Sequence, residues 1–293
     1  MNYQPCPICG NDKPKEIANI GVSIFRCRKC NLEYVDAEEM ISLCNSANND
    51  LDQNLQYLNA LKSIQTLRRA NNNKILIFME KFLPKKSIGL EVGSAVGLFM
   101  EQAKAKYVIS GIEPMSSSFE TAKEKGLDVI KGFFPKDIDF SKQYDFIIFN
   151  DVFEHIPNTK CVMESCEKLL KNGGFLLINL PDSSGILHKI SSFLYSIGDS
   201  SSIKRLWQVG TESPHLYYFN SYSLDLLAEK YRFYRTGFLK LDSFSKEGLS
   251  ERINAIPVGK LKGFIYNIGL IILYPLLHLM YSDTNLYVYK KKV

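Results

Sequence analysis

The sequence predicts an α/β protein whose mostly parallel sheet carries helices on both faces, preceded by a small cysteine-containing unit. Two observations lead to this expectation. From Ser87 onward, short apolar runs alternate with helix-like stretches, which is the interval typical of a parallel sheet with crossover helices. Before that point, four of the seven cysteines form two close pairs within residues 1–36.

These two patterns divide the chain into three parts. Residues 1–36 form the cysteine-containing unit, and residues 37–86 form a polar helical linker or cap. Within this linker, Leu55, Leu58, Leu61, Ile64 and Leu67 have the spacing of an amphipathic helix. Residues 87–293 form the main domain. In it, residues 183–222 follow the end of the fifth expected strand, where α/β enzymes place their binding loops.

The strands and helices of the main domain can be assigned in chain order. The apolar runs predict strands at 87–92, 107–112, 128–131, 144–149 and 174–180. Helical stretches are expected at 97–106, 116–125 and 159–171. Residues 183–213 are rich in serine and read as irregular, and a helix near 223–231 and strands near 233–244 and 285–289 complete the pattern.

Charge and cysteine usage limit the class of protein. The net charge of +5 comes from lysines and arginines spread among acids, whereas a nucleic-acid binder usually has a clustered basic face. No apolar stretch opens the sequence, so a cytoplasmic location is expected. Thiols stay reduced there, and paired cysteines indicate a metal rather than a disulfide.

The two cysteine pairs have the spacing of a zinc ribbon. Cys6 and Cys9 form one C-x2-C turn, and Cys27 and Cys30 form the second after seventeen intervening residues. Zinc takes four thiolates in a tetrahedron, which leaves no open position, so the ion would be structural. Four reduced cysteines without metal are the alternative. We expect the other three cysteines to be packing residues: Cys44, Cys161 and Cys166.

A glycine-containing loop follows the first strand of the main domain. In the run Glu91-Val92-Gly93-Ser94-Ala95-Val96-Gly97, Gly93 and Gly97 allow a ligand to approach the backbone. The G-x-G-x-x-G pattern of dinucleotide enzymes is absent. Glu113 ends the second strand, where a carboxylate can accept both hydroxyls of a ribose. A solvated strand-end carboxylate is the alternative for Glu113.

Three later segments complete a family pattern. They are Asp151-Val-Phe-Glu-His155, Leu170-Lys-Asn-Gly-Gly174 and His215-Leu-Tyr-Tyr-Phe219. With the loop Glu91–Gly97, in which Ala95 replaces the middle glycine, they resemble class I S-adenosylmethionine-dependent methyltransferases of the ubiquinone/menaquinone type. The zinc-ribbon subgroup found with bacterial polysaccharide genes is the most similar. The resemblance covers nearly the whole chain and is weakest at 183–213 and 245–282.

The resemblance implies a seven-stranded Rossmann-like sheet with an antiparallel last strand, and S-adenosylmethionine as cofactor. Glu113 would bind the ribose, and Gly93, Ser94 and Gly97 would lie along the methionine portion with Glu91 nearby. Phe133 would cover the adenine, although a core position is an equal alternative. Asn150 and Asp151 would lie near the methionyl group. Residues 183–222 would cover the substrate side. The acceptor would be a small molecule, such as a sugar or a lipid-linked glycan.

His155 and His215 are the candidate catalytic bases, because imidazole titrates near neutral pH and both lie within family motifs. A structural interpretation stands beside each. His155 could cap a helix, and His215 could pack against Tyr217 and Tyr218. Two other functions stay open: a ribosomal-RNA base methyltransferase, and a catalytically silent protein that binds partners through its ribbon.

Residues 263–281 contain no charged side chain and are long enough to span a bilayer. Pro275 and the strand expected at 285–289 argue against a span. We therefore expect a buried or interfacial helical segment, with contact to the inner membrane face through nearby lysines as a further option. The sequence leaves the oligomeric state open.

Overall fold

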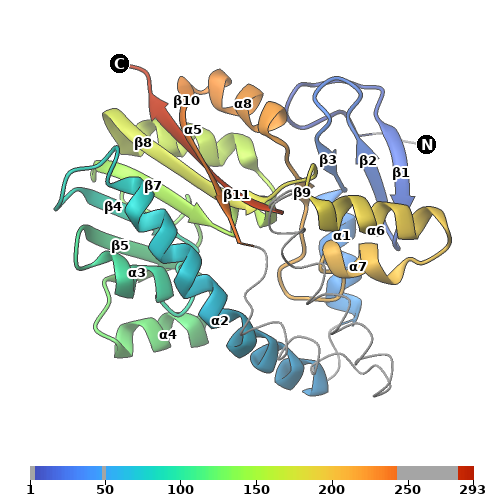
Figure 1. Cartoon of the computed structure of the whole chain (residues 1–293), viewed down its shortest axis with the longest axis horizontal. Coiled ribbons are helices and arrows are strands. Elements are labelled where there is room, and N and C mark those ends of the chain that lie inside the picture. The colour runs from blue at the N-terminus through green and yellow to red at the C-terminus, as the bar shows by residue number, and fades with distance from the viewer. Residues whose placement is uncertain (1–3, 48–50, 243–282) are drawn as a thin grey trace.

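A computed structural model describes residues 4–47, 51–242 and 283–293, and it contains two sheets (Figure 1). The larger sheet has seven strands in the order β10-β11-β8-β7-β4-β5-β6. Their bounds are β4 Ile88–Val92, β5 Val108–Glu113, β6 Val129–Lys131, β7 Tyr144–Asn150, β8 Leu170–Pro181, β10 Phe233–Leu241 and β11 Thr284–Lys291.

The direction of these strands confirms the expected architecture. Strands β4, β5, β6, β7 and β8 pair in parallel. The last strand, β11, lies antiparallel between β8 and β10. This is the mostly parallel Rossmann-like sheet with an antiparallel last strand. Because parallel strands end at one edge, the residues after β4, β5, β6 and β7 gather on the same side of the molecule.

Helices cover both faces of this sheet (Figure 1). On one face, α2 (Leu51–Met79), α3 (Leu98–Ala103) and α4 (Ser116–Glu124) share a core with Phe146 and Ile148 of β7. On the other, α5 (Thr159–Leu169) and α8 (Ser221–Lys230) share a core with Ile147 and Phe149. Both faces of β7 are buried, which explains why its sequence is a continuous apolar run rather than an alternating one.

The smaller sheet joins the N-terminal unit to a distant part of the chain. It consists of β1 (Lys15–Asn19), β2 (Ser23–Arg26), β3 (Glu33–Tyr34) and β9 (Tyr217–Tyr218), paired antiparallel in that order. Helix α1 (Ala37–Ala47) follows β3. The fourth strand of this sheet, β9, therefore comes from the segment that carries the last of the family motifs.

The serine-rich stretch differs from expectation, because it contains helices rather than irregular chain. They are α6 (Ile186–Ser196) and α7 (Ser201–Leu206). The Asp199 carboxylate accepts hydrogen bonds from the backbone N–H and the hydroxyl of Ser201 at 2.9 and 2.5 Å. The polar residues at 199–201 thus mark the start of a helix, which composition alone does not separate from a loop.

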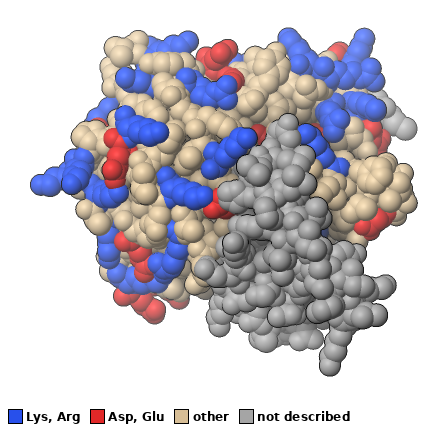
Figure 2. Space-filling view, viewed as in Figure 1, with Lys and Arg blue, Asp and Glu red and all other residues tan. Residues whose placement is uncertain are grey.

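None of the helices in the described ranges is both long enough and apolar enough to cross a membrane. Residues 263–281, for which we expect a buried or interfacial segment, lie outside the described residues. On the face in Figure 2, Lys and Arg side chains are distributed with acidic side chains between them.

Candidate functional site

The four cysteine sulfurs form one cluster. Sγ of Cys6 lies 3.6 Å from Sγ of Cys30, and Sγ of Cys9 lies 3.4 Å from Sγ of Cys27. All four sulfurs lie within 4.8 Å of one another. A tetrahedral zinc with Zn–S bonds of about 2.3 Å would separate its sulfurs by about 3.8 Å. The arrangement therefore fits a structural zinc ion.

Each C-x2-C turn is closed by a residue in the left-handed conformation. Gly10 (φ 72°) donates its backbone N–H to the Cys6 carbonyl at 2.9 Å, and Asn31 (φ 58°) donates to the Cys27 carbonyl at 3.0 Å. Glycine and asparagine tolerate this conformation best. The backbone N–H groups of Lys29 and Cys30 donate to Sγ of Cys27, at 3.4 and 3.5 Å.

The loop after β4 needs its glycines. Gly93 and Gly97 have φ values of 69° and 79°. A Cβ atom on Gly93 would lie 2.6 Å from Cγ2 of Val152, and one on Gly97 would lie 2.1 Å from Cδ1 of Leu127. Ala95 also has a positive φ, 47°, but its side chain is exposed. The site therefore accepts alanine where the family pattern has glycine, at the cost of a strained backbone.

Glu113 holds this loop in place from the end of β5. Its Oε2 accepts the backbone N–H of Ala95 at 2.8 Å, and its Oε1 accepts that of Met115 at 2.9 Å. Burial raises the pKa of Glu113, and the two hydrogen bonds oppose that shift. A carboxylate oxygen can accept more than one hydrogen bond, so both oxygens can also accept ribose hydroxyls.

Two buried polar atoms beside Glu113 have no hydrogen-bond partner within the described part of the chain: Oε2 of Glu91 and Oγ of Ser94. Both residues are 3% exposed. Burial and the neighbouring charge of Glu113 raise the pKa of Glu91 well above its usual range. An unpartnered buried polar group costs about 1–3 kcal/mol. The amino and hydroxyl groups of S-adenosylmethionine would satisfy such atoms, so the residues fit that cofactor.

Asn150 and Asp151 lie at the end of β7 in a network of amides. Nδ2 of Asn179 donates to Oδ1 of Asn150 at 2.6 Å and to Oδ1 of Asp151 at 3.2 Å. Nδ2 of Asn150 donates to Oδ1 of Asn72 in α2 at 3.1 Å. Asp151 has a φ of 58°, a conformation that is often found at functional sites.

Phe133 follows β6, and its side chain is 64% exposed. Its backbone N–H donates to Oδ2 of Asp137 at 2.8 Å. The ring therefore lies outside the core, at the same edge of the sheet as Glu113. An exposed aromatic ring there is available for stacking on a flat ligand.

His155 lies in the short helix η1 (Phe153–His155), with its ring centroid 4.8 Å from that of His215. Nδ1 of His155 lies 2.9 Å from the carbonyl oxygen of Pro214. A carbonyl can only accept, so Nδ1 carries the proton in the neutral ring and Nε2 keeps its lone pair. This Nε2 lies 3.8 Å from Oε1 of Glu154. Burial lowers the pKa of His155.

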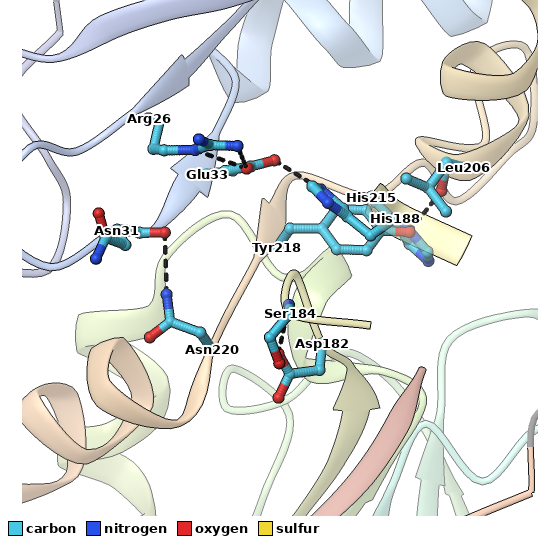
Figure 3. Close-up of polar contacts among 10 residues, drawn as sticks. All are labelled: Arg26, Asn31, Glu33, Asp182, Ser184, His188, Leu206, His215, Tyr218 and Asn220. Carbon is cyan, nitrogen blue, oxygen red and sulfur yellow. Dashed lines mark hydrogen bonds and ion pairs between the residues drawn. The ribbon is translucent and has the colours of Figure 1, made fainter. Parts of the chain in front are cut away.

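His215 has partners on both ring nitrogens. Nδ1 lies 3.1 Å from the hydroxyl oxygen of Tyr218, which donates its own proton to the Leu206 carbonyl at 2.9 Å (Figure 3). Nε2 lies 3.0 Å from Nε2 of Gln208. Burial, and to a lesser extent His155, lower the pKa of His215 well below its usual range. The structure thus places His215 in a packed environment beside Tyr218.

Glu154 completes this cluster, although it is not among the site residues predicted from the sequence. It is 1% exposed, and its Oε2 has no hydrogen-bond partner within the described residues. Burial and the charge of Asp151 raise its pKa well above the usual range. The charge of Arg68 in α2 acts on Asp151, Glu154 and His155.

Four site residues were thus missed: Arg68, Asn72, Glu154 and Asn179. Asn179 did leave a signal in the sequence, since it is a polar residue within the apolar run 175–180 of β8. Glu154 stood inside a recognised motif. Arg68 and Asn72 left no such signal in the sequence, because they lie on a helix whose contacts depend on the tertiary fold.

Comparison with known proteins agrees with this geometry. A family model described as a methyltransferase domain matches residues 64–234, more than half of the chain. An uncharacterised protein of Methanocaldococcus jannaschii is 30% identical over 115 residues, covering 38% of this chain. A ubiquinone biosynthesis O-methyltransferase of Bordetella avium is 28% identical over 132 residues, covering 42% of this chain. Each match covers 53% of the relative, so the chain spans about half the length of these curated proteins.

Solved structures share the fold at low identity. The plantazolicin methyltransferase BpumL in complex with SAH has a TM-score of 0.54 at 16% identity, covering 87% of this chain and 96% of that chain. A complex of the Haloferax volcanii Trm112 methyltransferase activator with a methyltransferase described as putative has a TM-score of 0.52 at 10% identity, covering 79% and 93%. These likenesses concern the arrangement of the sheet and its helices.

Proposed function

Because the chain belongs to the methyltransferase-domain family, we propose that it transfers a methyl group from S-adenosylmethionine to a small-molecule acceptor. The hydrogen bond from Ala95 to Glu113 carries this proposal, since it joins the glycine loop to the carboxylate that would hold the ribose. The cofactor, when bound, supplies an electrophilic methyl group on a sulfonium. Glu91, Ser94, Asn150 and Asp151 orient it, and orientation is the main demand of such a displacement.

His155 is the proposed general base for a hydroxyl acceptor. Its Nδ1 is held by the Pro214 carbonyl at 2.9 Å, and its lowered pKa keeps the ring neutral with a free lone pair on Nε2. A base in this state can take a proton near neutral pH. His215, whose two nitrogens have partners, would support the ring of His155 from 4.8 Å rather than contact the acceptor.

A lipid-linked glycan is the proposed acceptor class, because helix α6 of the cover has an exposed apolar side. Ile190 and Phe193 within this helix and Ile197 at its C-cap are 43%, 64% and 65% exposed. Lys204 and Arg205 of α7 are also exposed. Apolar side chains beside cations suit a lipid carrying phosphate. The proposed location is therefore the inner face of the membrane. Separately, we propose that the four cysteines of the N-terminal unit hold a structural zinc.

The experiment that tests this function is transfer of an isotopically labelled methyl group. Purified protein and labelled S-adenosylmethionine are incubated with membrane and aqueous extracts of a strain lacking the gene. We expect the label in the lipid-extractable fraction. Mild acid should release it from the lipid, as it releases sugars that are linked to a lipid through phosphate. His155→Asn should reduce transfer by about a hundredfold or more if His155 is the base, and His215→Asn by less. Label in ribosomal RNA would contradict the proposal.

A further inference from the structure

The cysteine ribbon (residues 4–35) and the cover (residues 183–222) share one sheet. Glu33 and Tyr34 of β3 pair with Tyr218 and Tyr217 of β9. The backbone N–H of Val35 extends this pairing by donating to the Leu216 carbonyl at 3.2 Å. The second cysteine turn leads directly into β3, so the position of β9 depends on how that turn is held.

A buried charged group joins the ribbon to helix α6 (Figure 3). Oε2 of Glu33 lies 2.8 Å from Nε2 of His188, and the two side chains are 2% and 4% exposed. Arg26 of β2 donates to Oε1 of the same carboxylate from Nε and Nη2, at 2.9 and 2.6 Å. A buried carboxylate with all of its partners in place fixes the relative position of the elements that carry them.

The cysteine turns also contact helix α8. The side-chain amide of Asn220 donates to the carbonyl of Asn31 at 3.0 Å (Figure 3). It also donates to the carbonyl of Cys30 at 3.4 Å. Asn220 is at the same time the N-cap of α8, where it accepts the backbone N–H of Ser223 at 2.9 Å. The ammonium group of Lys230, at the end of α8, donates to the carbonyl of Ile8 in the first cysteine turn.

The segment around β9 continues these contacts to the histidines. The backbone N–H of Leu216 donates to the carbonyl of Glu154 at 3.0 Å. The Tyr217 hydroxyl donates to the Pro157 carbonyl at 2.6 Å. His215 directly precedes Leu216, and Pro214 accepts the hydrogen bond of His155. Glu91, Glu113 and the glycine loop, by contrast, are held by β4 and β5 of the larger sheet.

We propose that the metal centre of the ribbon supports the acceptor half of the active site, with Glu33 as the positioning residue that transmits this support to the cover. This inference rests on the proposed function, because that function defines which half of the site binds the acceptor and which half binds the cofactor. Metal at the four cysteines fixes β3, and β3 fixes β9, α6 and the Glu154–Pro157 segment. Loss of the metal therefore loosens the acceptor half while the cofactor half stays formed.

The test is hydrogen–deuterium exchange of the full chain, read peptide by peptide, together with calorimetry of S-adenosylhomocysteine binding. In Cys27→Ser, exchange across 183–220 should rise by about tenfold or more, as for local opening. Peptides of β4, β5 and β7 should stay protected, and the dissociation constant of S-adenosylhomocysteine should change by less than about threefold. A change confined to residues 4–35, or equal loss of protection in both halves, would overturn the proposal.

A second pair of variants separates Glu33 from the metal itself. Glu33→Gln removes the buried charge but leaves all four cysteines. Glu16→Gln is the matched control, since Glu16 is an exposed ribbon carboxylate that accepts a hydrogen bond from Ser23 Oγ at 2.8 Å. We expect Glu33→Gln to keep one zinc per chain and to loosen 183–220, and Glu16→Gln to behave like the wild type.

The outcomes of this pair are distinct. Unchanged exchange across 183–220 in Glu33→Gln would contradict the positioning role. Loss of cofactor affinity in that variant would also contradict it, because Glu33 would then support both halves of the site. Absence of S-adenosylhomocysteine binding by the wild type would instead refute the proposed function. The exchange comparison would still measure the link between ribbon and cover.

Discussion

The backbone N–H of Ala95 donates a 2.8 Å hydrogen bond to Oε2 of Glu113. This bond crosses from the loop after β4 to the end of β5, and it fixes the loop against the carboxylate that we propose for the ribose. Ala95 makes this contact from the left-handed conformation, at a φ of 47°. The departure from the family pattern at this position therefore leaves the bond intact.

Ala95→Gly should raise the free energy of unfolding by about 1 kcal/mol, because an alanine in the left-handed conformation pays a steric cost that glycine avoids. The hydrogen bond to Glu113 comes from the backbone, so cofactor affinity should be kept. Urea titration and calorimetry of S-adenosylhomocysteine measure the two quantities. A less stable glycine variant would show that Ala95 is not strained as its φ indicates.

The purified protein should carry one zinc per chain, measured by elemental analysis. Cys27→Ser removes one of four thiolates and should lose the metal, with a fall in melting temperature of about 5 °C or more, since metal binding supplies folding free energy to a small ribbon. Cys161→Ser is the control, because Cys161 lies in α5 away from the cluster. Equal zinc content in both variants would contradict the assignment.

The buried histidines should make stability depend on pH. The pKa of His215 is lower in the folded chain than its usual 6.5, so the unfolded state takes up a proton first as pH falls. The free energy of unfolding should therefore decrease below about pH 6.5, by up to about 1.4 kcal/mol per pH unit for one group. Above about pH 6.5 the ring is neutral in both states, so the histidine no longer lowers the free energy of unfolding.

His215→Asn should flatten this decrease. The raised pKa of Glu154 carries the opposite sign, with stability lost as pH rises through the folded pKa. The difference between wild-type and His215→Asn profiles, measured by urea unfolding from pH 5 to 8, isolates the histidine. Parallel profiles would mean that His215 titrates as it does in the unfolded chain.

The sequence predicted the larger sheet well because its signals are local. Strand β7 is buried on both faces, and its apolar run Phe146–Phe149 needs no knowledge of the fold to be recognised. The loop glycines and Glu113 were found for a similar reason, since strand ends and turn residues mark one edge of a parallel sheet.

Two of the contacts that the sequence left hidden join residues that are distant in the chain. Asn72 meets Asn150 across 78 residues, and Glu33 meets His188 across 155. No periodicity or spacing encodes such pairs, which depend on how helices and sheets pack. The two-residue strand β9 was hidden too, because the strand with which Tyr217 and Tyr218 pair in the described structure is formed by the N-terminal unit.

The most direct test of the central claim is calorimetry of S-adenosylhomocysteine binding to the wild type, to Glu113→Ala and to the exposed-carboxylate control Glu16→Gln. We expect the wild type and the control to bind S-adenosylhomocysteine. Glu113→Ala should weaken this binding by about 1.5–3 kcal/mol, as expected for hydrogen bonds to a charged group. Equal affinity in all three proteins, or tighter binding of NAD than of S-adenosylhomocysteine by the wild type, would contradict the central claim.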